Sequence, residues 1–137
     1  MSFKSGFEYY QCEDGIYHMS FYDHQKTTID GCFRYLEQIY LATPPNQQVR
    51  LLLDARPSTG LMLMLKYITD KSRELNSKLK RPRLAVAIVI ETTIFSRVLD
   101  TTLRVFIRSD DALRIFDLSQ YDTAVEWLQQ AAATAGD

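Results

Sequence analysis

Two apolar runs constrain the fold more than any other feature of the chain. Leu84–Ile90 consists of seven consecutive apolar residues, and the stretch from Val49 to Leu53 is apolar except for Arg50. A strand with one solvated face alternates polar and apolar side chains, whereas a strand covered on both faces is apolar throughout. Both runs therefore predict inner strands of a parallel sheet that carries helices on both sides.

The remaining segments complete an α/β fold with a mostly parallel five-stranded sheet. Gly6–Cys12 and Ile16–Tyr22 flank Asp14-Gly15, which predicts an N-terminal β-hairpin, and Ala112–Phe116 predicts a last short strand. Helices are expected from Thr27 to about Ala42-Thr43, where Pro44-Pro45 follows, from about Gly60, from about Thr93 to Ile107, and from Ser119. The order ββαβαβαβα predicts one domain over residues 1–137.

Two of the helix starts carry capping signals. Thr27 is expected to cap the first helix, and Asp30 three positions on favours its positive end. Ser119-Gln120-Tyr121-Asp122 resembles a capping box with an acidic last residue, which predicts that the final helix begins at Ser119.

Composition narrows the function classes. The 137 residues are 46% hydrophobic and 24% charged with a net charge of −1, which indicates a globular protein and argues against nucleic-acid binding. Two cysteines without CxxC spacing predict neither a disulfide framework nor a metal site, and no cofactor motif is present. No signal peptide or membrane-length apolar run is found, so we expect a cytoplasmic protein that is not transmembrane.

Charge is unevenly distributed between two parts of the chain. Seven basic residues lie between Lys66 and Arg83, whereas the segment from Ser109 to the end is mainly acidic. A solvated helix face is the expected explanation for the basic strip, and binding of an acidic partner is the alternative.

The junction after the first apolar run is the best candidate for a working site. Ligands and switches in α/β proteins collect where a parallel strand ends and a helix begins. The candidate switch or partner-binding residues are Asp54, Arg56, Ser58, Thr59 and Gly60. A phosphate on Ser58 or Thr59 would add about −1.5 to −2 charges at a helix N-terminus beside Arg56. The alternative is that one hydroxyl is an ordinary N-cap.

Catalytic patterns are missing from the sequence. His24 follows Asp23, and His18 lies on a strand, but neither belongs to a nucleophile or metal motif. We therefore expect structural roles for both histidines and predict no catalytic residues.

Two helical segments are more apolar than one buried face requires. The candidate residues for an apolar pocket or an interface are Met62, Met64, Ile94, Leu103, Val105 and Ile107. Such an excess is explained by deep core packing, by a homodimer interface through the predicted helix at Thr93–Ile107, or by the wall of a pocket for an apolar small molecule or lipid.

Three local motifs resemble the SpoIIAA-like branch of the STAS superfamily of anti-sigma-factor antagonist domains. They are Leu51-Leu52-Leu53-Asp54, the run Leu84–Val89, and Leu113-Arg114-Ile115-Phe116-Asp117 leading through Tyr121 and Ala124 to Trp127-Leu128. The last is similar to that branch's "R-x-F-D" strand followed by "A-x-x-W-L". The motifs cover about residues 49 to 130 and are structural, so they speak more for a fold than for an activity.

The resemblance also bears on function. Ser58-Thr59-Gly60-Leu61 is similar to the D-S-S-G-L segment of classical antagonists, in which phosphorylation of a serine releases a protein partner. Pro57 replaces the aspartate of that segment, and the loop after Asp54 is shorter. The resemblance implies a non-enzymatic regulatory or protein-interaction module without a cofactor. The alternative is an apolar-ligand or lipid-binding protein of CRAL-TRIO-like character, since the branch is grouped by fold with such domains.

Overall fold

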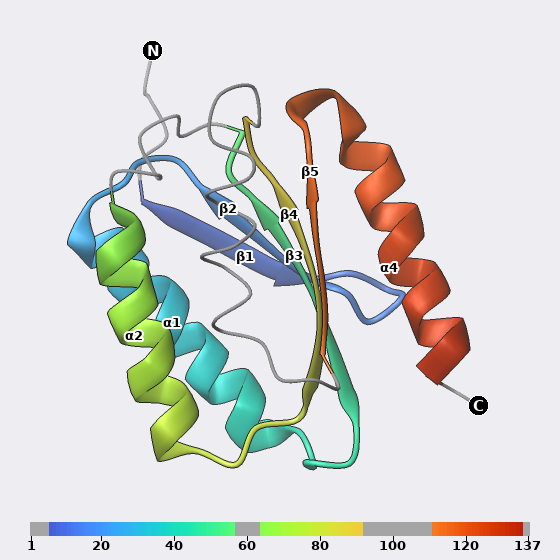
Figure 1. Ribbon diagram of the computed structural model, residues 1–137, viewed down its shortest axis with the longest axis horizontal. Helices are drawn as coiled ribbons and strands as arrows, with labels where there is room; N and C mark the ends of the chain where they lie inside the picture. The colour runs from blue at the N-terminus through green and yellow to red at the C-terminus, as the bar shows by residue number, and fades with distance from the viewer. Residues whose placement is uncertain (1–5, 57–63, 92–110, 136–137) are drawn as a thin grey trace.

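The computed structural model describes residues 6–56, 64–91 and 111–135, with side chains up to residue 131. In chain order the elements are β1 (Phe7–Gln11), β2 (Tyr17–Phe21), α1 (Lys26–Ala42), β3 (Gln48–Asp54), α2 (Leu65–Lys78), β4 (Arg83–Val89), β5 (Ala112–Phe116), the 3₁₀ turn η3 (Leu118–Gln120) and α4 (Tyr121–Ala135). They form an α/β structure around one sheet (Figure 1), so the predicted class is confirmed. The helix predicted at Thr93–Ile107 lies outside the described residues.

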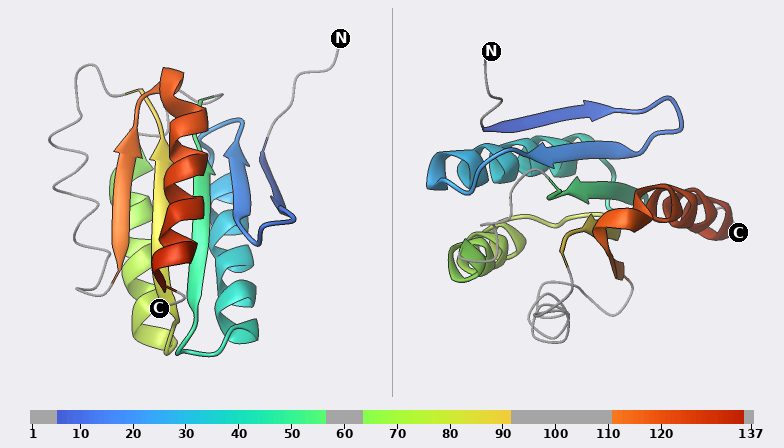
Figure 2. Two further views of the ribbon diagram at one scale, coloured as in Figure 1. Left: turned by 90° about the vertical axis from the view of Figure 1, so that its right-hand side faces the viewer. Right: turned by 90° about the horizontal axis from the view of Figure 1, so that it is seen from above.

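The strands lie side by side in the same order as in the chain, from β1 to β5. β1 runs antiparallel to β2, and the pairs β2–β3, β3–β4 and β4–β5 are parallel. The sheet is therefore mixed, with the antiparallel strand at one edge, as the hairpin signal predicts. Viewed from above (Figure 2), α1 and α2 cover one face of the sheet and α4 covers the other.

The hairpin turn depends on Gly15. Its φ of 89° lies in the region that favours glycine, and its N–H donates to the carbonyl of Cys12 at 2.9 Å. An added β-carbon would also approach the guanidinium of Arg50 to 3.0 Å. Backbone conformation and space both select glycine here, which is the physical basis of the Asp14-Gly15 signal.

Each face of the sheet has its own apolar core. The core under α1 and α2 includes Met19, Leu51 and Val86, and the core under α4 includes Leu52, Ala87 and Phe116. Small residues on β4, Ala85 and Ala87, are fully buried below α4 and leave room for the helix to approach the sheet. Phe116 and Trp127 pack with ring centroids 6.0 Å apart, so the two halves of the "R-x-F-D … A-x-x-W-L" motif meet in this core.

The first helix begins one residue earlier than predicted, and Thr27 is not its cap. α1 starts at Lys26, its N-cap residue is Gln25, and Thr27 is exposed within the first turn. The carboxylate of Asp23 serves the helix start instead, because it accepts hydrogen bonds from the Gln25 N–H at 3.1 Å and from the Thr28 hydroxyl. The helix ends at Ala42 as expected before Pro44-Pro45.

The predicted capping box at Ser119–Asp122 is also wrong. The box is formed two residues earlier by Asp117 and Gln120, whose side chains each bond to the other's main chain. Asp117 has the extended backbone of an N-cap, at φ −71° and ψ 166°, whereas Ser119 already lies inside the 3₁₀ turn. The start of α2 at Leu65 follows residues 57–63, which lie outside the described residues, so the start predicted near Gly60 stays a prediction.

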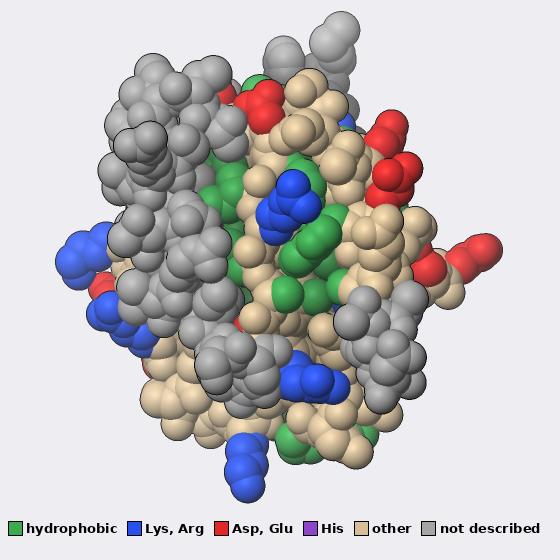
Figure 3. Space-filling model, turned by 45° about the vertical axis from the view of Figure 1, so that its right-hand side comes forward, with side chains coloured by type: hydrophobic (Ala, Val, Ile, Leu, Met, Phe, Trp, Pro, Cys, Tyr) green, Lys and Arg blue, Asp and Glu red, His purple; other side chains and the backbone are tan. Residues whose placement is uncertain are grey.

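Most of the described cations in the basic strip pair with acids of the same chain. Lys66, Lys71 and Lys78 form ion pairs with Asp70, Asp30 and Glu37, at 3.0, 3.5 and 3.0 Å. These contacts favour the solvated-face explanation over an acidic partner. On the face in Figure 3, hydrophobic side chains lie beside one central basic side chain, and acidic side chains lie mainly toward the right-hand margin and the top.

One ion pair of the strip is buried. Nη2 of Arg81 lies 2.5 Å from Oδ2 of Asp111, and the two side chains are 2% and 0% exposed. Oδ1 of Asp111 also accepts the main-chain N–H of Leu84 at 2.8 Å, and Nε of Arg81 donates to Asn76 at 3.0 Å. The pair therefore joins the end of α2 to the starts of β4 and β5.

We expect Arg81→Met to lower the free energy of unfolding by about 3–5 kcal/mol, because the buried carboxylate of Asp111 would lose its counter-ion. The control is Lys66→Met, whose ion pair is exposed and which should change stability by less than about 1 kcal/mol. Urea denaturation of both variants measures the difference. Equal effects would contradict the role given to the buried pair.

Candidate functional site

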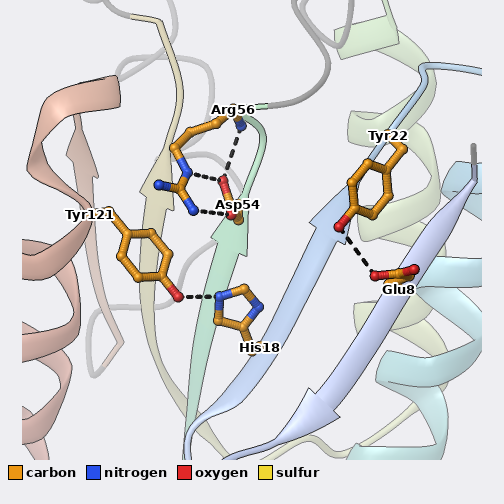
Figure 4. Close-up of polar contacts among 6 residues, drawn as sticks. All are labelled: Glu8, His18, Tyr22, Asp54, Arg56 and Tyr121. Carbon is orange, nitrogen blue, oxygen red and sulfur yellow. Dashed lines mark hydrogen bonds and ion pairs between the residues drawn. The ribbon is translucent and has the colours of Figure 1, made fainter. Parts of the chain in front are cut away.

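Polar side chains gather where β3 ends and α4 begins. Asp54 is the last residue of β3, Arg56 follows two positions later, and Tyr121 is the first residue of α4. The parallel register places Ser20 of β2 beside Asp54. His18 lies on the same face of β2 as Ser20, since side chains two positions apart point to the same side. Figure 4 shows the side chains of His18, Asp54, Arg56 and Tyr121 converging between β2, β3 and α4.

Asp54 and Arg56 form a bidentate ion pair. Nε and Nη2 of Arg56 each lie 2.8 Å from a different carboxylate oxygen of Asp54, and the Arg56 main-chain N–H also donates to Oδ1 at 3.1 Å. The Asp54 side chain is buried and that of Arg56 is 42% exposed. The hydrogen bonds from Arg56 to Asp54 raise the pKa of the guanidinium, which therefore stays charged. The contacts fix the chain as it leaves β3.

Three aromatic rings extend this pair into a connected group. The guanidinium carbon of Arg56 lies 4.1 Å from the ring centroid of Tyr121, which is cation–π geometry. The Tyr121 hydroxyl lies 2.5 Å from Nε2 of His18, and the His18 ring stacks on Tyr10 with centroids 4.7 Å apart. We call Tyr10, His18, Asp54, Arg56 and Tyr121 the β3-end cluster.

Electrostatics keep the two central rings neutral. Burial raises the pKa of Tyr121 to about 12, and the negative charge of Asp54 acts in the same direction. Burial also lowers the pKa of His18, with Arg56 adding to this effect and Asp54 opposing it. At neutral pH the contact therefore joins a phenol and a neutral imidazole.

The cluster holds the guanidinium of Arg56 in place and is poorly suited to proton transfer. A phenol with a pKa of about 12 is a poor nucleophile, and Nε2 of His18 is occupied by that phenol. Nδ1 of His18 is buried and has no hydrogen-bond partner among the described residues. Arg56, by contrast, is fixed on one side by Asp54 and on another by Tyr121, while the rest of its side chain faces solvent.

The structure describes only part of the predicted sites. Asp54 and Arg56 are in direct contact, and Met64 is partly buried just before α2. The other candidates lie outside the described residues, namely Ser58, Thr59, Gly60, Met62, Ile94, Leu103, Val105 and Ile107. The phosphorylation switch and the apolar pocket therefore stay predictions.

Sequence reasoning did not assign Tyr10, His18 or Tyr121 to a site. A signal was present for His18, because it and Ser20 are the polar positions of a strand whose other face is apolar. Both are buried, at 5% and 7% exposure, so the hairpin's second strand is covered on two faces. Nothing in the local sequence around Tyr121 indicates that its hydroxyl would reach His18.

A groove lies on the opposite face of the sheet from the β3-end cluster. It has a volume of about 380 Å³, runs between β1 and α1 and is lined by Phe7, Tyr9, Tyr35, Arg34, Gly6, Thr27, Thr28, Gly31 and Gln38. No group of three or more His, Cys, Asp or Glu side chains in the described part of the chain is arranged to hold a metal ion.

Comparisons with known proteins add no identification, since no family model, curated protein or solved structure matches the chain. Within residues 6–56, 64–91 and 111–135, no helix combines the length and the apolar character needed to cross a bilayer.

We expect Asp54→Asn to destabilise the protein by about 1–3 kcal/mol, because the amide cannot accept the same hydrogen bonds from Arg56. The matched control is Asp70→Asn, which breaks an exposed ion pair and should cost at most about 0.5 kcal/mol. Denaturant unfolding of both variants measures the free energies. A cost no larger than that of the control would contradict the structural role of the pair.

Acidification tests the environment of His18. The pKa of His18 is lower in the folded protein than in the unfolded chain, so unfolding takes up a proton below about pH 6.5. Above that pH, His18 does not lower the free energy of unfolding. As the pH falls below it, the free energy of unfolding decreases by up to about 1.4 kcal/mol per pH unit.

The comparison is with His18→Gln, which should remove this part of the pH dependence. Urea unfolding of both proteins between neutral and mildly acidic pH gives the two slopes. Parallel slopes would show that His18 does not resist protonation. Carboxylates with lowered pKa values, such as Asp23, titrate at lower pH and are common to both proteins.

Proposed function

We propose that the chain is a non-enzymatic regulatory or protein-interaction module of the SpoIIAA-like type. In this proposal the β3-end cluster and the adjoining segment that contains Ser58 and Thr59 contact a protein partner. The observation that carries the proposal is the fixed, partly exposed guanidinium of Arg56 at the carboxyl end of β3.

A pre-ordered arginine is suited to recognition. Free arginine side chains lose rotamer entropy on binding, at about 0.5–1.5 kcal/mol for an immobilised side chain. The contacts of Arg56 with Asp54 and Tyr121 impose much of this ordering before a partner arrives. A partner carboxylate or main-chain carbonyl can then accept a hydrogen bond from a donor that is already positioned.

The same arginine would bind a phosphate group placed on a neighbouring hydroxyl. Ser58 and Thr59 follow Arg56 by two and three residues. A phosphate on either hydroxyl would compete with Asp54 for the bidentate guanidinium, because phosphate accepts the same fork of N–H groups. The partner surface would change charge while the sheet below it stayed folded.

Two further observations support this class over an enzyme. The α/β architecture with an antiparallel first strand agrees with the fold that the SpoIIAA-like resemblance implies. The one histidine of the cluster is buried, neutral and bonded to a phenol, and no activated nucleophile among the described residues is in contact with it.

The test first uses the purified protein as bait to capture partner proteins. The affinity of each purified partner for the protein is then measured by calorimetry. We expect Arg56→Gln to weaken a true partner about tenfold, equivalent to about 1.4 kcal/mol. Ser58→Asp and Thr59→Asp should also change its affinity, whereas Ser58→Ala should not.

The matched control is Lys66→Gln, which removes an exposed cation outside the cluster. Circular dichroism establishes that all variants are folded. A partner whose affinity is the same for wild type, Arg56→Gln and the aspartate variants would contradict the proposal.

A further inference from the structure

The outer edge of β1 carries main-chain groups that no described element pairs. β1 has only β2 as a neighbour in the sheet. Hydrogen bonds from Tyr22 N–H to Gly6 and from Cys12 N–H to Ile16 show that the even-numbered residues of this strand bond toward β2. Since antiparallel pairs alternate, the N–H and C=O groups of Phe7, Tyr9 and Gln11 point outward.

Among the described residues, this edge has no proline, lysine, bulge or covering element to prevent strand addition. Natural edge strands are protected by proline, lysine, bulges or a covering element. β1 reads Phe-Glu-Tyr-Tyr-Gln and pairs with β2 in unbroken register, and its last four residues are exposed. Both views in Figure 2 show β1 as the outermost described strand on its side, with α1 lying over the sheet rather than beyond the edge.

An aromatic surface lies directly beside the open edge. Tyr9 is 52% exposed, and its ring stacks on Tyr35 of α1 at 3.7 Å between centroids. Both rings line the groove between β1 and α1. In a strand added to this edge, every second side chain would lie on the same face of the sheet as Tyr9. Those side chains would therefore lie over the groove.

We propose that the edge binds a second copy of this chain, with the two β1 strands antiparallel around a two-fold axis at Tyr9. The contact would join two five-stranded sheets into one continuous sheet. This inference rests on β1 and α1, and Tyr10 is the one residue that it shares with the β3-end cluster.

The strand is self-complementary in this register. Tyr9 lies opposite Tyr9 of the second copy, and Phe7 lies opposite Gln11, so every outward N–H and C=O of the strand has a partner. A two-fold axis at Glu8 would oppose two carboxylates, and one at Tyr10 would leave Phe7 opposite a residue beyond the strand.

Side chains on both faces also match. Glu8 lies opposite Tyr10 of the second copy, so no like charges face each other in this register. On the other face, the two Tyr9 rings meet at the axis, and each covers the open side of the other copy's groove. Cross-strand aromatic pairs of this kind stabilise sheets.

The first experiment measures mass against concentration by native mass spectrometry and sedimentation. We expect a two-chain species in wild type and an increase of about tenfold or more in the dissociation constant of Tyr9→Lys, which opposes two charges at the axis. Tyr10→Lys is the matched control. Tyr10 is 53% exposed on the opposite face, and a lysine there would face Glu8, so the dimer should persist.

The second experiment tests the register in a Cys12→Ser background. Residues opposite each other on the axis lie about 5.5 Å apart between Cα atoms, within disulfide range. Tyr9→Cys should form a covalent dimer on mild oxidation, and Tyr10→Cys should not. A wild-type monomer at all concentrations would overturn the proposal. So would a dimer that Tyr9→Lys leaves intact, because its interface would lie elsewhere, or equal cross-linking of the two cysteine variants.

Discussion

Burial of both faces of the inner strands is the constraint on which this structure depends. β3 and β4 carry apolar side chains on each side, so neither can lie at a solvated surface. Helices α1 and α2 cover one face, and α4 alone covers the other, where Ala85 and Ala87 of β4 allow it to pack closely. The position of α4 then decides where the polar cluster forms.

The β3-end cluster lies where the apolar cover of α4 gives way to polar groups. Below α4 the sheet presents Leu52, Val89 and Phe116, whereas toward β2 it presents His18 and Ser20. Tyr121, at the start of α4, spans this boundary with its ring against Arg56 and its hydroxyl on His18. Buried polar groups require partners, and here His18 of β2 bonds to Tyr121 of α4 and Asp54 of β3 bonds to Arg56.

The proposed partner surface and the proposed copy interface overlap only at Tyr10. The first is at the carboxyl end of β3, and the second is along the outer edge of β1 and the groove beside α1. Adjacent strand residues point to opposite faces, so Tyr9 and Tyr10 contact different surroundings. Tyr9 stacks on α1, and Tyr10 stacks on His18 within the cluster.

Local sequence determined those parts of the protein that depend on nearby residues. The apolar runs predicted β3 and β4, Asp14-Gly15 predicted the hairpin, and the end of the first run marked Asp54 and Arg56 as candidate site residues. These features arise from side-chain alternation, from a turn glycine and from residues two positions apart. The predictions of the capping residues Thr27 and Ser119 were wrong. Asp23 and Asp117, which lie within a few residues, can also cap a helix, and the backbone conformation selected them.

Only the tertiary structure decided which distant side chains meet. His18 and Tyr121 are 103 residues apart, and Arg81 and Asp111 are 30 apart. No periodicity or motif encodes those contacts, because they follow from strand order and from the face that α4 covers. The unpaired edge of β1 was equally invisible in the sequence, since an edge strand is defined by the neighbour it lacks. Packing of both sheet faces selected one arrangement, and that arrangement placed the cluster and the edge.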